Sequence, residues 1–202
     1  MMDRIDAFSA LHVPGDPLVL YNIWDAGSAR AVAAAGAKAI ATGSWGVAEA
    51  NGFSDGETLP LEIALENLTR ILSVTDLPVS IDMEAGYGDT PAAVGTSVGK
   101  AHEAGASGIN MEDRMPGETG LLPVAQAAER VAAAAATGIH VNARTDVYLR
   151  RDPKDYTPAL VEDVLTRAAA LAEAGARILF FPLSLIPTCL LLRPPIPISQ
   201  RM

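Results

Sequence analysis

The stretch Pro78-Val-Ser-Ile-Asp-Met-Glu-Ala-Gly-Tyr-Gly-Asp89 predicts a buried strand that ends at a ligand site. Val79 and Ile81 are β-branched and favour a strand. Alternation along that strand would place Asp82 and Glu84 on one face, where two carboxylates repel each other unless a cation lies between them. The stretch therefore predicts a divalent-cation site with hard oxygen ligands. The alternative is a polar strand end that is simply exposed to solvent.

On either side of this stretch, one phrase recurs: a helix end, a glycine and then a strand. It contains Gly36, Gly105 and Gly175. A glycine at the end of a helix is a common C-cap. The two spacings are nearly equal, and each corresponds to two βα units of roughly 35 residues. Strict alternation of strands and helices predicts a parallel sheet.

The expected elements follow from the periodicity of apolar residues and from capping signals. The expected strands are Leu18–Ile23, Lys38–Thr42, Pro78–Glu84, Ser107–Glu112, Gly138–Arg144 and Arg177–Pro182. The expected helices are Ser28–Ala35, Leu61–Val74, Pro91–Ala104, Val124–Ala136 and Pro158–Ala174. Asp25 or Ser28 is the candidate cap of the first helix, and Thr90 precedes a proline suited to a first helical turn.

Six strands are too few for a closed barrel of eight, and the end of the chain differs in composition from the rest. Pro182 and the four prolines within residues 183–202 oppose a helix and most strands from residue 182 onward. We expect an α/β fold of the (β/α)₈ TIM-barrel type, incomplete, with about six βα units over residues 1–182 and an irregular proline-rich tail over 183–202. A shifted reading frame or another aberrant end would explain the tail. The alternative is an authentic tail that packs over a sheet edge.

The composition excludes several classes of protein. Half of the 202 residues are hydrophobic, so a substantial core is expected. The net charge of −9 argues against binding to nucleic acid or to anionic membrane surfaces. A single cysteine, Cys189, excludes an internal disulfide. With neither a signal-peptide pattern nor an apolar run near the ~20 residues of a membrane span, the expected location is the cytoplasm.

Polar side chains gather at the carboxyl ends of the expected strands, which is where parallel α/β folds place their sites. The fifth strand contributes His140, Asn142 and Arg144 on one face. Arg144 suits a bidentate grip on a carboxylate or phosphonate, the alternative being an ion pair with a neighbouring acid. His140 is as consistent with a core residue as with a catalyst.

Four motifs occur in order along the chain: Asn22-Ile-Trp-Asp-Ala-Gly-Ser-Ala29, Asp82-Met-Glu-Ala-Gly-Tyr-Gly-Asp89, Gly108-Ile-Asn-Met-Glu-Asp113 and Asn142-Ala-Arg-Thr-Asp146. Together they resemble the isocitrate lyase/phosphoenolpyruvate mutase superfamily over residues 22–182. The resemblance implies a (β/α)₈ barrel and dependence on Mg²⁺, with Mn²⁺ as the alternative ion. It also implies the cleavage or formation of C–C or P–C bonds in small 2-oxo or 2-hydroxy carboxylates.

The resemblance also implies roles for individual residues. Asp82, Glu84 and Glu112 would form the metal site. Asp55 would have a catalytic or gating role, and Arg144 would bind the anionic end of the substrate and act in catalysis.

Contacts to the substrate carboxylate would fall on Gly43, Ser44 and Trp45.

Intact family members are expected to be homo-oligomers, because their final helix packs on a neighbouring subunit. Strands seven and eight and this final helix have no recognisable match here, so the oligomeric state of this chain stays open.

One segment departs from the resemblance. The lyases of the family have a mobile loop with a Lys-Lys-Cys-Gly-His core whose cysteine is the acid/base, whereas residues 114–123 contain neither cysteine nor histidine. Arg114 and Glu118 are the available substitutes. We therefore expect an enzyme that acts on a small 2-oxo acid and does not cleave isocitrate. The alternative is an inactive, truncated remnant of such an enzyme.

Overall fold

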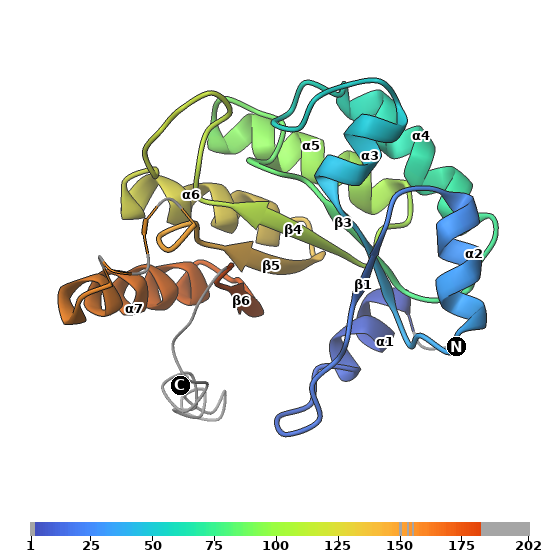
Figure 1. Ribbon diagram of the computed structural model, residues 1–202, viewed down its shortest axis with the longest axis horizontal. Helices are drawn as coiled ribbons and strands as arrows, with labels where there is room; N and C mark the ends of the chain where they lie inside the picture. The colour runs from blue at the N-terminus through green and yellow to red at the C-terminus, as the bar shows by residue number, and fades with distance from the viewer. Residues whose placement is uncertain (1–2, 150, 153, 155, 183–202) are drawn as a thin grey trace.

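The computed structural model describes residues 3–149, 151–152, 154 and 156–182 of the chain. Within these residues, one parallel sheet has its strands in sequence order, so each strand pairs with the next (Figure 1). The strands are β1 (Tyr21–Ile23), β2 (Ile40–Thr42), β3 (Val79–Asp82), β4 (Gly108–Glu112), β5 (His140–Arg144) and β6 (Ile178–Phe180). The predicted parallel α/β sheet of six strands is confirmed.

The described residues also form seven helices. They are α1 (Arg4–Ala10), α2 (Ala26–Ala34), α3 (Ser44–Ala50), α4 (Leu61–Leu72), α5 (Pro91–Glu103), α6 (Val124–Ala135) and α7 (Pro158–Glu173). All five predicted helices are present, but α1 and α3 were not predicted. Each of these two has only seven residues, which is too short for an apolar stripe to repeat.

Some predicted boundaries are corrected by local backbone geometry. The strand predicted to run to Glu84 ends at Asp82, because Glu84 has a φ of 47° and the backbone has left the extended conformation. Helix α2 begins earlier than predicted, since Asp25 and Ser28 cap each other's backbone amides reciprocally. Thr90 caps α5, as predicted.

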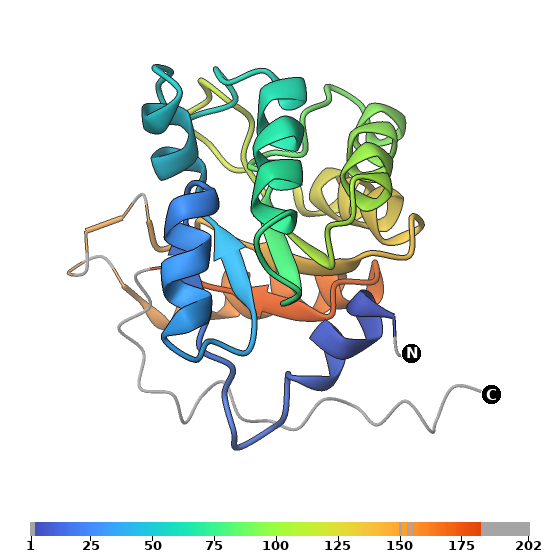
Figure 2. The ribbon, with the colours of Figure 1, turned by 90° about the vertical axis from the view of Figure 1, so that its right-hand side faces the viewer.

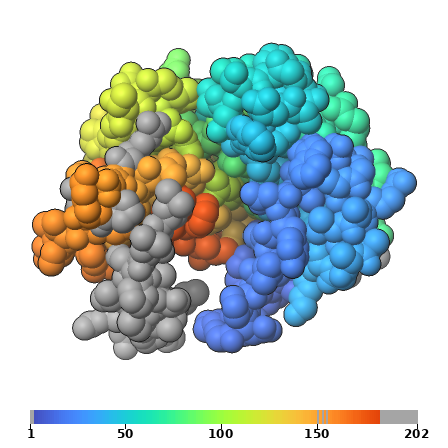
Figure 3. Space-filling view, in the orientation of Figure 1, coloured from blue at the N-terminus to red at the C-terminus, as the bar shows by residue number. Residues whose placement is uncertain are grey.

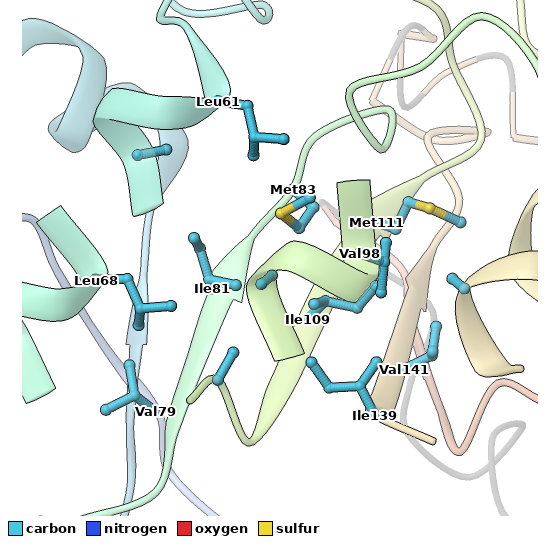
Figure 4. Close-up of a cluster of buried hydrophobic side chains, with 14 of the residues drawn as sticks. Leu61, Leu68, Val79, Ile81, Met83, Val98, Ile109, Met111, Ile139 and Val141 are labelled. Atoms are coloured by element: carbon cyan, nitrogen blue, oxygen red, sulfur yellow. The ribbon is translucent and has the colours of Figure 1, made fainter. Parts of the chain in front are cut away.

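Apolar side chains on one face of the sheet pack against helices α2 and α4–α6. Val79 and Ile81 of β3 lie in the same buried cluster as Leu68 of α4, and Ile109 of β4 lies in it with Val98 of α5 (Figure 4). Helix α1 lies on the opposite side of the sheet from α2, α4 and α5 (Figure 2). The face that α2 and α4–α6 leave uncovered is therefore the one on which the alternate, polar residues of the strands lie.

Helix α1 closes the amino-terminal end of this polar face. Phe8 is 2% exposed and meets the ring of His140 edge-on at 5.0 Å. Gly108 lies beneath Phe8, and a Cβ added to Gly108 would be only 2.7 Å from the Phe8 ring. The absence of a side chain at Gly108 is therefore what lets the helix approach the sheet.

The buried imidazole of His140 predicts a pH dependence of stability. Burial, followed by the charges of His12 and Arg177, lowers its pKa from 6.5 to about 4. The unfolded chain binds a proton at a higher pH than the folded chain does. His140 therefore contributes full stability above pH 6.5, and this contribution decreases as the pH falls towards 4. The loss is expected to reach roughly 1–3 kcal/mol.

Urea denaturation of the wild-type protein and a His140→Gln variant at pH 7.5 and 4.5 measures this contribution. The difference in free energy of unfolding between the two proteins should shrink at the lower pH. His102→Gln is the matched control, because that ring is only partly buried and caps the Thr137 carbonyl. Equal pH dependence of wild type and His140→Gln would show that the assignment is wrong.

Among the described residues, we find no helix with both the length and the apolar character needed to cross a membrane. The expectation about the proline-rich tail concerns residues 183–202, which lie outside the described part of the chain.

Candidate metal and substrate site

A row of polar side chains crosses three neighbouring strands on the polar face of the sheet. Strand register aligns Asp82 of β3 with Asn110 of β4, and Asn110 with Asn142 of β5. The Asn142 amide donates to Asn110 Oδ1 at 3.0 Å, and the Asn110 amide donates to Asp82 Oδ1 at 3.2 Å. This chain of amide donors ends at one carboxylate and so fixes its orientation.

The Asp82 carboxylate is held from two further directions. The backbone N–H of Ser44 donates to Oδ2 at 3.3 Å, and the backbone N–H of Glu84 donates to Oδ1 at 3.1 Å. The Asp82 backbone N–H is itself bonded to Thr42 Oγ1 at 2.9 Å. Asp82, Glu84, Thr42 and Ser44 line one small pocket between the sheet and α4. The ends of β2 and β3 thus bring a fixed carboxylate to the rim.

Glu84 follows the strand in a left-handed conformation and its side chain is buried. Burial raises its pKa to about 7, and the nearby charges of Asp55, Asp82 and Glu57 raise it as well. The backbone N–H of Glu57 donates to Glu84 Oε2 at 2.8 Å and opposes this shift. A buried carboxylate among three other acids is a position where a cation would be stabilising.

Glu112, at the end of β4, belongs to a ring of alternating charges. Its two oxygens contact Arg114 Nη2 at 3.0 Å and Arg144 Nη2 at 3.2 Å. The same arginines contact Asp146, Arg144 Nε at 2.5 Å and Arg114 Nε at 3.5 Å. Burial raises the pKa of Glu112 to about 7, although Arg144 and Arg114 lower it. The sequence left open whether Arg144 pairs with a neighbouring acid, and the structure shows such ion pairs with Glu112 and Asp146.

The three predicted metal ligands lie at one rim, but they do not form a compact cluster. In the described part of the chain, no three His, Cys, Asp or Glu side chains are grouped closely enough to hold a metal ion. Mg²⁺ commonly keeps several of its waters, so ligation through water tolerates this spacing. The all-oxygen donor set and the raised pKa values of Glu84 and Glu112 fit a hard cation. The assignment of these three ligands stays a prediction.

The other predicted residues lie around the same rim. Gly43 caps α3, and Ser44 opens that helix beside Asp82. Trp45 is 67% exposed, so any contact with substrate would require the substrate to extend to that side. Asp55 is exposed in the loop after α3. This loop and the loop of residues 114–123 both lie at the top of the molecule in Figure 3.

Asp113 and Arg167 are residues whose roles were not predicted. The Asp113 carboxylate is buried and accepts from Thr145 Oγ1 at 2.6 Å and from the Asp146 backbone N–H at 3.0 Å. Arg167 of α7 contacts Asp113 at 3.3 Å and the Leu122 carbonyl at 2.9 Å. Both ends of the 114–123 loop are thus tied to the sheet and to α7. No sequence periodicity marks these tertiary contacts.

Glu57, Tyr87 and Arg130 were missed as well. Arg130, on α6, is 4% exposed and donates to the carbonyls of Ala85 and Gly88, at 2.7 Å in both cases. In the sequence, no local pattern distinguishes Arg130 from an exposed arginine on a helix. The nearest sequence signal for Glu57 is its position two residues after Asp55.

Comparison with known proteins agrees with a barrel-type α/β fold. Residues 8–190 match the model of the phosphoenolpyruvate phosphomutase family. An uncharacterised protein of Mycobacterium tuberculosis, Rv1998c, is 37% identical over 88% of this chain and 66% of its own length. The chain therefore spans about two thirds of the length of that relative.

Two solved structures show the same fold. A candidate phosphonomutase from Burkholderia cenocepacia is 46% identical, with a TM-score of 0.85 over 88% of this chain and 73% of the other. A phosphonopyruvate hydrolase, solved with oxalate and Mg²⁺, is 22% identical, with a TM-score of 0.81 over 93% of this chain and 65% of the other. The predicted incomplete TIM-barrel type is thereby confirmed.

The fold defines a barrel-type α/β protein with a group of polar residues at the carboxyl ends of its strands. The chain belongs to the phosphoenolpyruvate phosphomutase family, within the isocitrate lyase/phosphoenolpyruvate mutase superfamily. Members of this superfamily are lyases, mutases and hydrolases that act on small 2-oxo carboxylates and related acids.

Proposed function

We propose that this chain carries the catalytic rim of a Mg²⁺-dependent enzyme that cleaves a C–C or P–C bond in a small 2-oxo or 2-hydroxy carboxylate. The observation that carries the proposal is the rim itself. Asp82, Glu84 and Glu112 bring three carboxylates to it, with Arg144 beside them. Metal dependence is also supported by the Mg²⁺ in the phosphonopyruvate hydrolase relative. The cation would supply electrophilic stabilisation of the enolate that remains when the bond breaks.

The three carboxylates are assigned to holding the cation, with Asp82 the most rigidly placed. The Asn110 amide donates to Asp82 and is itself oriented by the Asn142 amide, so the two amides hold Asp82 in place. The raised pKa values of Glu84 and Glu112 mean that a cation would have to displace protons near neutral pH. Cation binding is therefore expected to strengthen as the pH rises through about 7.

Arg144 is assigned to the anionic end of the substrate. Its ion pairs with Asp146 and Glu112 use Nε and Nη2, so Nη1 is the nitrogen that we expect to meet the substrate. The pairs also fix the plane of the guanidinium, which preserves directional binding of a carboxylate. The segment Gly43–Trp45 is assigned to the substrate carboxylate. The backbone N–H groups of Gly43 and Ser44 are bonded to the Ile23 carbonyl and to Asp82, so the Ser44 hydroxyl and the Trp45 backbone N–H are the donors that we expect to meet the substrate.

Proton transfer is assigned to the two loops above the rim. Arg114 is held at Glu112 and Asp146, which makes it a structural cation rather than an acid or base. Asp55 and Glu118 are exposed, so each would reach the substrate only after its loop moved inward. Isocitrate cleavage by the cysteine route is not expected, because residues 114–123 lack a thiol.

A thermal-shift screen of 2-oxo acids and oxalate, with and without Mg²⁺, tests this function. At a ligand concentration 100 times the Kd, linkage predicts about 2.7 kcal/mol of stabilisation, or several degrees in Tm. We expect oxalate or a 2-oxo acid to raise the Tm only when Mg²⁺ is present, and isocitrate to release no glyoxylate. A Tm that no acid changes with Mg²⁺ present would contradict the proposal.

A further inference from the structure

Backbone strain in the described residues is concentrated beside the predicted metal site. Three non-glycine residues there have positive φ: Glu57 at 56°, Glu84 at 47° and Tyr87 at 50°. Such conformations cost of order 1 kcal/mol or more each and persist only where surrounding contacts hold them. Glu57 lies in the loop after α3, whereas Glu84 and Tyr87 lie in the loop after β3. The strained residues of these two separate loops therefore lie next to one another.

The three residues hold one another through hydrogen bonds that run in both directions between the loops. The Glu57 backbone N–H donates to Glu84 Oε2 at 2.8 Å. In return, the Tyr87 backbone N–H donates to Glu57 Oε1 at 2.9 Å. The Tyr87 hydroxyl lies 3.4 Å from Glu84 Oε1 and adds a weaker contact. Each glutamate thus caps a backbone amide of the other loop.

The loop after β3 is held from its other side by buried groups. Arg130 binds the carbonyls of Ala85 and Gly88, and Ser97 Oγ donates to the Tyr87 carbonyl at 2.7 Å. These contacts satisfy carbonyl oxygens, whereas the Glu57 carboxylate satisfies the Tyr87 amide. Glu57 therefore supplies an interaction that Arg130 and Ser97 do not replace.

We propose that Glu57 is a positioning residue that sets the backbone of Glu84 and Tyr87 and thereby couples the Asp55 loop to the cation site. The proposal rests on the proposed function, in which Glu84 helps to hold Mg²⁺. Asp55 lies two residues before Glu57, so the bonds that fix Glu84 also fix the base of the loop carrying Asp55. A cation that orders Glu84 should then also order residues 55–57.

The decisive variant is Glu57→Gly, which removes the carboxylate and tolerates the positive φ without strain. We expect its Mg²⁺ affinity, measured by calorimetry, to fall about 10- to 100-fold, the usual effect of losing an outer partner of a metal ligand. Hydrogen exchange at the Tyr87 amide should become at least about tenfold faster. Glu57→Gln keeps an acceptor of the same length, so both quantities should return to within about threefold of wild type.

Glu49→Gln is the matched control, because it removes the same charge from an exposed position at the end of α3. It should leave Mg²⁺ affinity and Tyr87 exchange unchanged. Unchanged affinity and exchange in Glu57→Gly would overturn the proposal. So would weak binding in Glu57→Gln with a protected Tyr87 amide, since charge rather than positioning would then explain the effect.

Failure of the proposed function would give a different pattern from failure of this inference. If the wild-type protein does not bind Mg²⁺, the proposed metal dependence fails, and the coupling of Glu57 to a cation site fails with it. Hydrogen exchange at the Tyr87 amide would then still show whether Glu57 holds the loop after β3. If wild type binds Mg²⁺ and Glu57→Gly binds it equally well, only the positioning role of Glu57 is excluded.

Discussion

Replacing Arg144 with methionine is expected to lower the free energy of unfolding by about 3–5 kcal/mol, because it breaks a buried ion-pair network. The side chain of Asp146 is 0% exposed and that of Glu112 is 9% exposed, so neither can be fully rehydrated in the folded state. Arg114 stays in contact with both carboxylates but cannot replace the close Arg144–Asp146 pair. Urea denaturation measures the change.

Arg70→Met is the control for the loss of an arginine. Arg70 pairs with Glu66 one helical turn away, both side chains are more than half exposed, and the expected change is below about 1 kcal/mol. Equal destabilisation by the two substitutions would show that the charge ring does not stabilise the rim. Arg144→Met should also abolish the Mg²⁺-dependent thermal shift with a 2-oxo acid, measured at a temperature where the variant is folded.

Replacing Phe8 with alanine is expected to destabilise the protein by about 3–5 kcal/mol. Phe8 fills the space above Gly108 and meets the rings of both His12 and His140 edge-on. Its removal would leave a cavity at the amino-terminal end of the polar face and loosen α1. Chemical denaturation of the Phe8→Ala variant tests this directly.

Phe180→Ala serves as the comparison, because Phe180 is 43% exposed at the edge strand β6. The Phe180→Ala substitution should lower the free energy of unfolding by less than about half of the decrease caused by Phe8→Ala, since little buried apolar area is lost. A Phe8→Ala variant as stable as Phe180→Ala would mean that α1 is not part of the core.

The order and direction of the strands could be predicted, because the glycine-capped helix ends repeat along the chain. Period-two alternation also predicted correctly that His140, Asn142 and Arg144 share a face, and strand pairing sets them beside residues of β4. The same rule does not extend to Glu84. A left-handed backbone follows Asp82, so the direction of the Glu84 side chain is set by its bonds to another loop.

The contacts that hold the rim together could not be predicted from the sequence. Arg130 reaches the loop after β3 from α6, and Arg167 reaches Asp113 from α7, across 42 or more residues in each case. Such pairs depend on how helices pack on the sheet, and no local pattern encodes them. Helix α3 was missed because Gly43-Ser-Trp-Gly46 has the composition of a turn, whereas Ser44 in fact begins a helix.

The most direct test of the central claim is a calorimetric titration of Mg²⁺ into wild type and Glu112→Gln at pH 8. Glutamine keeps the shape of residue 112 and removes its charge. The predicted result is that wild type binds Mg²⁺ and that the affinity of Glu112→Gln for Mg²⁺ is lower by at least about tenfold. Glu129→Gln, on the exposed surface of α6, should bind as wild type does. Equal affinity of Glu112→Gln and wild type, or no binding to wild type, would contradict a cation site at this rim.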